Sequence, residues 1–277
     1  MLLQLFKSLF TLEFRRHFKI KQKIGAGGFG KVYVVARKAD SKLLAAKKLK
    51  KSKISHLAQT KAQGLLPLEI YCLNGLRHDN IIQVHGYVQT RYNWFIMMEY
   101  SQGSGDLFDF IKKRGPLPEK LSRDIFLQVH SAITYCLSVG VDHRDIKDEN
   151  ILIDISTHRI KLIDFGSASL YHKNTPYTYG RGTSILLPPE FYNTGSYLAL
   201  DATTWAFGCL VYKMVTGYHP FRNRDEILKY NPRLPRVGVL CRDFVRQCLA
   251  KGTEERMEYN RLAVHPWCSA DLYEIHI

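Results

Sequence analysis

The sequence lacks any pattern of paired cysteines. Its 277 residues include six cysteines, which lie far apart and form no C-x-x-C pair. A zinc knuckle and a dense disulfide framework are therefore not indicated, because both need cysteines at characteristic spacings. We expect the chain to work in a reducing compartment, with a cytoplasmic location that can extend to the nucleus.

A long apolar run is also missing. The strongest stretch, from Trp205 to Tyr212, stops at Lys213, well short of the ~20 residues that a membrane-crossing helix needs. We therefore expect no membrane span. Residues 1–18 form an amphipathic extension with apolar residues at helical spacing but no long uninterrupted run. We interpret it as a helix packed on the body or a remnant of a longer chain, with membrane contact or targeting as the alternative.

Acidic residues are scarce relative to basic ones. The chain has 40 Lys and Arg against 25 Asp and Glu, a formal net charge of +15, which should draw it to polyanions. The basic residues are spread along the whole length and do not alternate with aromatics in one block, so we expect no nucleic-acid partner. The densest basic run, from Lys47 to Lys53, is interpreted as a solvated face.

The remaining composition, 45% hydrophobic and 23% charged, is that of a globular protein with a substantial core. Short β-branched runs predict strands at residues 19–24, 31–36, 43–49, 81–88, 94–100, 151–154 and 160–163. Helical spacing predicts helices at residues 65–76, 107–113, 118–139, 199–216 and 242–251. With the glycines at 103 and 105 between them, these patterns indicate a small β-rich lobe, a linker and a larger α-rich lobe.

A glycine-rich string, Gly25-Ala-Gly-Gly-Phe-Gly30-Lys-Val32, lies between the first two predicted strands. Residues without a Cβ let the backbone approach phosphate oxygens and offer them amide N–H groups. A dinucleotide-binding fold would need a helix directly after the string, whereas a strand is predicted here. The context favours a loop over a nucleotide, with a ligand-free glycine hairpin as the alternative.

Lys47 follows in the third predicted strand. Its ammonium group can neutralise the α and β phosphates of a nucleotide, and Glu69 in the next predicted helix can hold that flexible side chain in place. Neither residue alone indicates a function. Their order and spacing after the glycine string favour a shared role.

The most informative segment runs from His143 to Asn150 and is followed by Asp164-Phe-Gly. Phosphoryl transfer depends mainly on positioning and charge neutralisation. Asp145 can accept the proton of an attacking hydroxyl, and Lys147 can screen charge on the γ-phosphate. Asn150 and Asp164 carry oxygen ligands of the kind that magnesium prefers.

These motifs, in this order, resemble those of eukaryotic serine/threonine protein kinases over residues 20–267, most of all the Pim kinases and the kinase domains of PAS-domain kinases. The resemblance implies an α+β, two-lobed protein kinase fold. It places the kinase domain at 19–267, with an N-lobe at 19–100, a hinge at 99–106, a C-lobe at 106–267 and a C-terminal tail at 268–277. It also implies ATP and Mg²⁺ as cofactors, transfer of the γ-phosphate to Ser/Thr hydroxyls of proteins, and autophosphorylation.

The resemblance further implies which residues form the site. Met98 is expected as the gatekeeper, with the backbone of Glu99 and Ser101 meeting adenine. The implied catalytic residues are Asp145, Lys147, Lys47 and Glu69, and the implied metal ligands are Asn150 and Asp164. The implied nucleotide-binding residues are Gly25, Ala26, Gly27, Gly28, Phe29, Gly30, Val32, Ala45, Lys47, Met98, Glu99, Ser101, Asp106 and Leu152.

An activation segment is implied between Gly166 and Glu190. Glu190 is expected to pair with Arg256, and Thr183 is expected to contact Lys147 and Asp145. Two interpretations of its regulation stay open. Either a phosphate on Thr178 orders the segment through the positive charges Arg144, Lys173 and Arg181, or the segment is ordered by its own contacts, as resemblance to the Pim kinases implies.

Protein or peptide substrates with basic residues upstream of Ser or Thr are the expected partners, and the enzyme is expected to be a monomer. The resemblance places four acids around the substrate: Asp106, Asp109, Asp148 and Glu149. Arginine forms charge-assisted hydrogen bonds with such carboxylates. The alternative is that these acids only cap helices, Asp106 being well placed before the predicted helix at 107–113.

Two residues depart from the family pattern. Thr203 stands where most kinases have an Asp that anchors the catalytic loop, and Asp142 stands where the relatives have an apolar residue. Two other functions are weighed against a protein kinase: a catalytically inactive scaffold, and a phosphotransferase for small molecules. The presence of Lys47, Asp145 and Asp164 disfavours the first, and the Gly182–Glu190 segment, which resembles a peptide-docking loop, disfavours the second.

Overall fold

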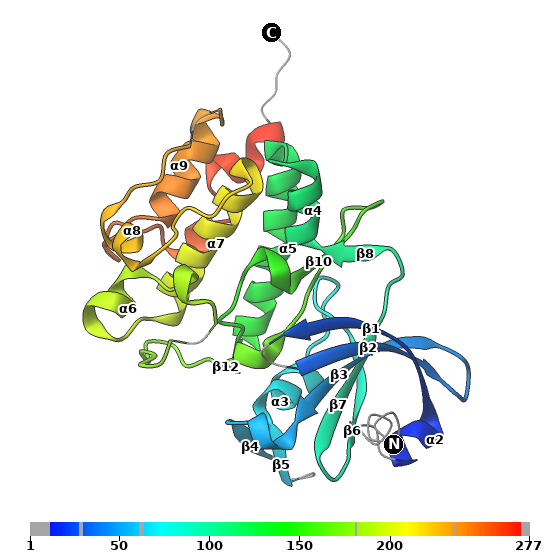
Figure 1. The fold of residues 1–277 in the computed structure, drawn as a ribbon. Helices are drawn as coiled ribbons and strands as arrows, with labels where there is room; N and C mark the ends of the chain where they lie inside the picture. Colours follow the sequence, from blue (N-terminus) through cyan, green and yellow to red (C-terminus); the bar gives the residue numbers. More distant parts are fainter. Residues whose placement is uncertain (1–11, 28–29, 61–63, 181, 235, 273–277) are drawn as a thin grey trace. The chain divides into compact units, whose positions relative to one another are not determined.

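The computed structural model describes residues 12–27, 30–60, 64–180, 182–234 and 236–272. The chain divides into two compact units, residues 1–78 with 82–102 and residues 79–81 with 103–277. Helices and strands of both units are labelled in Figure 1, and the α+β class that the sequence predicts is confirmed. In the described part of the chain, none of the helices combines the length and the apolar character that crossing a membrane would require.

The first unit is built on an antiparallel five-stranded sheet in the order β1-β2-β3-β7-β6 (Figure 1). A hairpin of β4 and β5 and two short helices complete it. Its elements are α2 (Leu12–His17), β1 (Phe18–Gly27), β2 (Gly30–Arg37), β3 (Leu43–Lys50), β4 (Leu57–Thr60), β5 (Gly64–Pro67), α3 (Leu68–Asn74), β6 (Val84–Gln89) and β7 (Asn93–Glu99).

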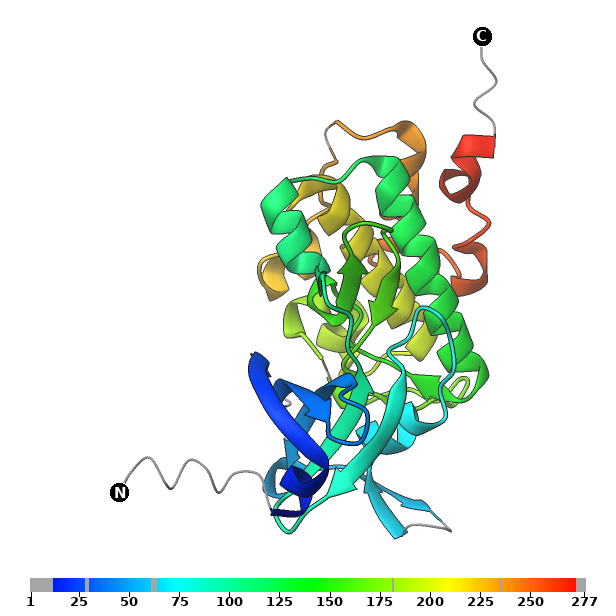
Figure 2. The ribbon, with the colours of Figure 1, turned by 90° about the vertical axis from the view of Figure 1, so that its right-hand side faces the viewer.

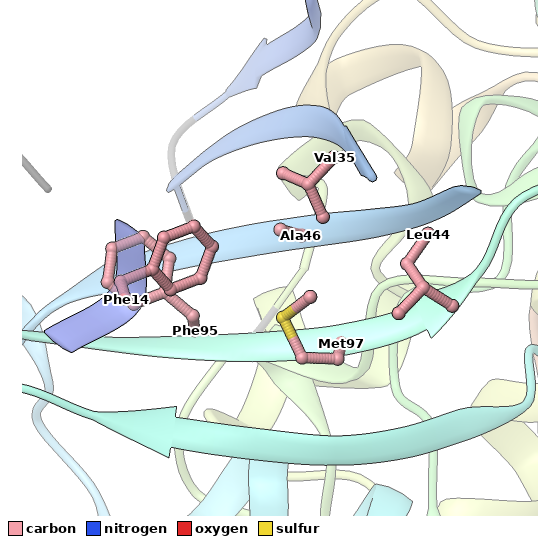
Figure 3. Packing of buried hydrophobic residues seen from close by; sticks show 6 residues of the cluster. All are labelled: Phe14, Val35, Leu44, Ala46, Phe95 and Met97. Carbon is pink, nitrogen blue, oxygen red and sulfur yellow. The ribbon is translucent and has the colours of Figure 1, made fainter. Parts of the chain in front are cut away.

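One face of this sheet carries an apolar cluster, shown in Figure 3. Its members are Phe14, Val35, Leu44, Ala46, Phe95 and Met97. Phe14 of α2 is fully buried, and its ring centroid lies 4.4 Å from that of Phe95. Because successive side chains of a strand point to opposite faces, Leu44 and Ala46 turn to this cluster while Ala45 and Lys47 turn to the other face.

In the described part of the N-terminal extension, Leu12–His17 form the helix α2, which contacts the sheet through Phe14. Residues 1–11 of that extension lie outside the described residues. The interpretation of the basic run as a solvated face is wrong for Lys47 and Lys48, which are each only 5% exposed. Both lie in β3, a central strand of the sheet, so burial follows from the strand's position.

The predicted helix at 65–76 is shorter in the structure. Residues Gly64–Pro67 form β5 and pair with β4, and α3 begins only at Leu68. Leu65 is 57% exposed whereas Leu66 is 2% exposed, and this alternation is that of a strand. The hairpin was not predicted from the sequence.

The second unit is mainly helical, with the long α5 and α7 at its centre. Phe126 of α5 packs edge-to-face on Phe207 and Phe244, with ring centroids 5.2 and 5.0 Å away. Figure 2 shows α5 beside the short strands β10 and β11. The elements are β8 (Ser104–Asp106), α4 (Leu107–Arg114), α5 (Glu119–Ser138), β9 (Val141–Asp142), β10 (Ile151–Asp154), β11 (Ile160–Leu162), β12 (Ser169–Leu170), α6 (Pro189–Thr194), α7 (Ala199–Thr216), α8 (Arg224–Lys229) and α9 (Val239–Cys248).

Short paired strands and 3₁₀ turns connect the helices of this unit. Strands β11, β10 and β8 form one small sheet, and β12 pairs with β9. The predicted helix at 199–216 coincides with α7. Helix α9 starts three residues before the prediction of 242–251 and ends at Cys248, after which Leu249 caps it by donating its backbone N–H to Val245 O.

Candidate active site

In the first unit, Lys47 and Glu69 form a buried ion pair. Lys47 Nζ lies 2.5 Å from Glu69 Oε1, and the two side chains are 7% and 9% exposed. Lys47 belongs to the central strand β3 and Glu69 to the first turn of α3. The contact that the sequence predicts between these residues is present, and it fixes the direction of a side chain that has four rotatable bonds.

The face of the sheet that carries Lys47 also carries other residues expected at the nucleotide. Strand register places Val32 opposite Lys47 and Ala45 opposite Met98. Directly opposed residues share a face of a sheet. Gly25 in turn pairs with Val32. The four side chains Val32, Ala45, Lys47 and Met98 therefore lie on one surface, although they come from three strands.

The glycine string forms the turn between β1 and β2, with Gly27 paired to Gly30 and Ala26 to Lys31. Gly28 and Phe29 lie outside the described residues. Gly30 has a φ of 149°, and a Cβ there would lie 2.4 Å from the carbonyl oxygen of Lys48. No other residue fits at this position, so the sheet itself requires this glycine.

The segment expected to meet adenine leaves β7. Glu99 exchanges hydrogen bonds with Gln83, donating its backbone N–H to Gln83 O at 2.9 Å and accepting from Gln83 N at 2.7 Å through Oε1. These bonds fix the end of β7, and Ser101 follows as an exposed residue. In the second unit, Asp106 of β8 and Leu152 of β10 are direct partners in the small sheet.

In the second unit, the catalytic loop brings Asp145, Lys147 and Thr183 together. Lys147 Nζ donates to Thr183 Oγ1 at 2.7 Å and lies 3.4 Å from Asp145 Oδ2. Asp145 Oδ1 accepts from the backbone N–H of Thr183 at 3.0 Å and from its hydroxyl at 3.1 Å. The predicted contact of Thr183 with both residues is therefore present. A Ser or Thr hydroxyl of a substrate can donate the same kind of hydrogen bond to this carboxylate.

Gly182 permits this close approach. Its φ is 83°, and a Cβ at that position would lie 2.6 Å from Arg144 O and 2.7 Å from Asp145 Oδ1. A larger residue would push the activation segment away from Asp145. The amino-acid sequence gives no sign of this contact, because Gly182 lies 37 residues after Asp145 in the chain.

Asn150 and the Asp164 segment are joined by backbone bonds. Ile163 N donates to Asn150 O at 2.9 Å. His143 bridges the same two segments, since its Nε2 lies 3.0 Å from Ile163 O and its Nδ1 accepts from Asp145 N at 3.3 Å. This organising role of His143 was missed in the sequence.

The residues fit the magnesium that the family implies. The amide nitrogen of Asn150 donates to both Asp145 O and Asp145 Oδ2, at 2.8 and 2.9 Å, so its oxygen is the atom available to a cation. Asp164 adds a carboxylate held by a hydrogen bond from Gly166 N to Oδ1. An amide oxygen and a carboxylate oxygen suit magnesium, which takes its other ligands from phosphates and water. Among the described residues no group of three or more His, Cys, Asp or Glu could hold a metal by itself.

The end of the activation segment is fixed by a buried ion pair. The Arg256 guanidinium donates to both carboxylate oxygens of Glu190, at 2.8 and 2.9 Å, and its side chain is 1% exposed. A bidentate pair of this geometry is directional as well as strong. The predicted partnership of Arg256 and Glu190 is thus present.

Arg144 contacts the activation segment itself. Its guanidinium donates to Tyr179 O and to the Tyr197 hydroxyl, both at 2.6 Å, and lies 3.9 Å from the centre of the Tyr177 ring. Tyr177 and Tyr197 also exchange backbone hydrogen bonds of 2.8 and 3.1 Å. These contacts favour the interpretation that the segment is ordered without a phosphate.

Three of the four acids expected near a substrate form one cluster. Asp106 caps α4 by accepting from Asp109 N at 2.7 Å, and burial followed by the charges of Asp109 and Glu149 raises the pKa of its carboxyl. Asp109 and Glu149 are exposed. The expectation is wrong for Asp148, which is 1% exposed. Burial and the neighbouring Glu149 raise the pKa of Asp148, because both disfavour its charged form.

Comparison with known proteins agrees with the kinase-like geometry of this site. The family model described as "Protein kinase domain" matches residues 18–268. Serine/threonine-protein kinase pim-2 of Danio rerio is 36% identical over 265 residues, which cover 92% of this chain and 85% of that protein. Serine/threonine-protein kinase prk-2 of Caenorhabditis elegans is 32% identical, with 92% of this chain and 59% of that protein covered. NUAK family SNF1-like kinase 2 of Rattus norvegicus is 36% identical over 76% of this chain and 33% of its own length.

Proposed function

The chain belongs to the protein kinase family and is a serine/threonine kinase close to Pim, and we propose that it phosphorylates Ser and Thr hydroxyls in basic sequence contexts, with magnesium and ATP. The network of Asp145, Lys147 and Thr183 is the observation that carries this proposal. It provides a carboxylate for the attacking hydroxyl and an ammonium group for the γ-phosphate, which are the main requirements of phosphoryl transfer.

Each unit contributes its own residues to the proposed reaction. In the first unit, Lys47 would hold the α and β phosphates, with Glu69 keeping its ammonium in place. In the second unit, Asn150 and Asp164 would hold Mg²⁺, which when bound neutralises phosphate charge. Asp145 would orient the substrate hydroxyl and take up its proton. Autophosphorylation, a monomeric state and a cytoplasmic location that can extend to the nucleus belong to the same proposal.

The preference for basic substrates rests on the acids that the structure places together. The charges of Asp109 and Glu149 both act on the Asp106 carboxyl, and Asp109 and Glu149 are exposed. Helix α4 packs against the 3₁₀ turn Asp148–Asn150 that carries Glu149. A cationic side chain beside this cluster would meet several negative charges at once. The net charge of +15 opposes the approach of a cationic peptide, but salt screens that repulsion beyond about 8 to 10 Å.

An arrayed peptide library tests this preference. Peptides with Arg at two to five residues before the Ser or Thr should be phosphorylated faster than Ala-substituted versions. Asp106→Asn and Glu149→Gln should each lower kcat/KM for the best Arg peptide by about two- to fivefold, as expected for partly exposed ion pairs. Asparagine caps helices as well as aspartate does, so the Asp106 variant removes charge but not the cap.

Glu254→Gln, a change of an exposed acid in a different loop, is the matched control and should leave the preference unaltered. Equal rates for Arg and Ala peptides with the parent enzyme would refute the basic preference. If the preference persists in both acid variants, recognition does not use this cluster.

Activity without phosphate on the activation segment is also expected. Arg144, one of the three positive charges that would bind a phosphate on Thr178, already donates to Tyr179 and Tyr197. Arg181, another of them, lies outside the described residues. Turnover of phosphatase-treated enzyme and of Thr178→Ala should stay within about twofold of the untreated parent, because the contacts that order the described part of the segment do not use a phosphate. A loss of tenfold or more after either treatment would show that phosphorylation orders the segment.

A further inference from the structure

Asp142 is a buried carboxylate directly before the catalytic loop. It ends β9, pairs with Ser169 of β12 and is only 3% exposed. Burial raises the pKa of its carboxyl to about 6, and the nearby Arg144 charge opposes that shift. Burying a carboxylate costs stability unless its oxygens are hydrogen-bonded. An Asp at this position therefore costs folding stability. This cost suggests that the residue serves a purpose other than stability.

The partners of Asp142 lie on two functional segments. Its Oδ1 accepts the backbone N–H of Arg144 at 3.2 Å. The Tyr177 hydroxyl donates to Leu170 O at 3.4 Å and lies near this carboxylate, because burial and then the Asp142 charge raise the pKa of Tyr177. Arg144 stands immediately before Asp145, and Tyr177 belongs to the activation segment. One carboxylate thus holds the start of the catalytic loop and lies near a tyrosine that stacks on the Arg144 guanidinium.

The backbone at Arg144 needs such support. Its φ is 62°, in the left-handed region that an arginine seldom adopts. Strained conformations of this kind persist only when surrounding contacts determine them. The hydrogen bond to Asp142 fixes the Arg144 amide, and the direction of the chain at Arg144 decides where the Asp145 carboxylate points.

Asp142 also lines a small cavity beside the catalytic loop. A cavity of about 40 Å³ is lined by residues that include Asp142, Arg144, Asp145 and Thr203. Thr203 lies on α7 and is 5% exposed. A carboxylate on either side of this cavity, at 142 or at 203, would be next to the same stretch of loop backbone.

From this arrangement we propose that Asp142 is a positioning residue, which holds the Arg144 backbone and so aims Asp145 at the substrate hydroxyl. It takes the place of a carboxylate that α7 does not supply, because position 203 is a threonine. This assignment rests on the proposed kinase function. The contacts on which it is based all lie among the described residues of the second unit.

Four variants test the proposal. Asp142→Leu removes the acceptor, and Asp142→Ala does the same without adding bulk. Asp142→Asn keeps an acceptor oxygen of the same shape. Asp142→Leu/Thr203→Asp returns a carboxylate to the cavity from the other side. Each is compared with the parent for kcat, KM for ATP, melting temperature and hydrogen exchange of the peptides covering residues 143–150 and 175–180.

Asp142→Leu is expected to lower kcat by about ten- to a hundredfold, because small displacements of catalytic groups have effects of that size. KM for ATP should change less than twofold. The melting temperature shows whether the variant is folded at the assay temperature, because the loss of a buried charge and the loss of the bond to Arg144 N act in opposite directions. Asp142→Asn should lose clearly less turnover. The double variant should regain at least about fivefold of the lost kcat, which a merely structural role for Asp142 would not produce.

Hydrogen exchange keeps the inference separate from the proposed function. Both acceptor-free variants should exchange faster than the parent at residues 143–150 and 175–180, whether or not any phosphate is transferred. A parent enzyme without kinase activity would refute the function alone. Unchanged exchange in Asp142→Leu and Asp142→Ala, parental kcat in both, a loss in Asp142→Asn as large as that in Asp142→Leu, or no rescue by Thr203→Asp would each overturn the positioning role.

Discussion

Replacing Lys47 by methionine is expected to lower kcat at least about a hundredfold, because loss of one positioned electrostatic contact in a catalytic site has an effect of that order. Lys47 Nζ lies 2.5 Å from Glu69 Oε1, so the side chain is held on the face of the sheet that carries Val32, Ala45 and Met98. Methionine keeps the length of the side chain but carries no charge for the phosphates.

This variant also leaves Glu69 buried without its partner. Unpairing a buried ion pair costs about 3 kcal/mol or more, so the melting temperature should fall although the circular dichroism spectrum at 25 °C should not change. Lys47→Met/Glu69→Gln removes the unpaired charge and should regain stability but not activity. Lys48→Met is the matched control, since Lys48 is a neighbour in β3 of equal burial, turned to the opposite face of the sheet. If the Lys47→Met variant were fully folded and still had near-normal turnover, the proposed role of Lys47 would be refuted.

Asp164→Asn is expected to reduce turnover by about a hundredfold or more and to raise the magnesium concentration needed for half-maximal rate. The amide oxygen of asparagine can still accept the bond from Gly166 N that holds Oδ1 in place. The change therefore removes one negative charge from the proposed metal ligand with little change of shape. Initial rates over a magnesium titration measure both effects.

Asp154→Asn provides the matched control for Asp164→Asn. Asp154 lies in the same unit, at the end of β10, where hydrogen bonds from Ser156 and Thr157 lower the pKa of its carboxyl to about 2. It is not among the proposed metal ligands, so its replacement should leave the magnesium titration unchanged. If Asp164→Asn behaved like Asp154→Asn, the metal assignment would be wrong.

Local chemistry made much of the fold predictable. The glycine turn between β1 and β2, the alternating strands and the helix at 199–216 follow from patterns within a few residues of one another. The β4–β5 hairpin could not be found in this way, because Leu65 and Leu66 fit the spacing of a helix as well as that of a strand. Pairing of β5 with Leu57–Thr60 decides between them, and pairing is not written in the local sequence.

In the candidate site too, some features could be predicted from the sequence and others could not. Lys47, Asp145, Asn150 and Asp164 could be named because their residue types and spacing match the needs of phosphoryl transfer. The burial of Asp148 could not, since an acid next to Glu149 in a polar segment gives no sign of being 1% exposed. The sequence also offered no explanation for an acid at position 142. The hydrogen bond that Asp142 accepts from Arg144 and its position near Tyr177 exist only in the folded chain, where the loop and the activation segment lie side by side.

Transfer of the terminal phosphate of γ-labelled ATP is the most direct test of the central claim. The full chain is incubated with labelled ATP, an Arg-containing Ser/Thr peptide and either magnesium or a chelator, beside Lys47→Met and Asp164→Asn. A serine/threonine kinase should place label on the Ser or Thr of the peptide only with magnesium, and both variants should lose at least about 99% of it. ATP binding without labelled peptide would indicate a scaffold, and label on small molecules alone would indicate another phosphotransferase; either result would contradict the account.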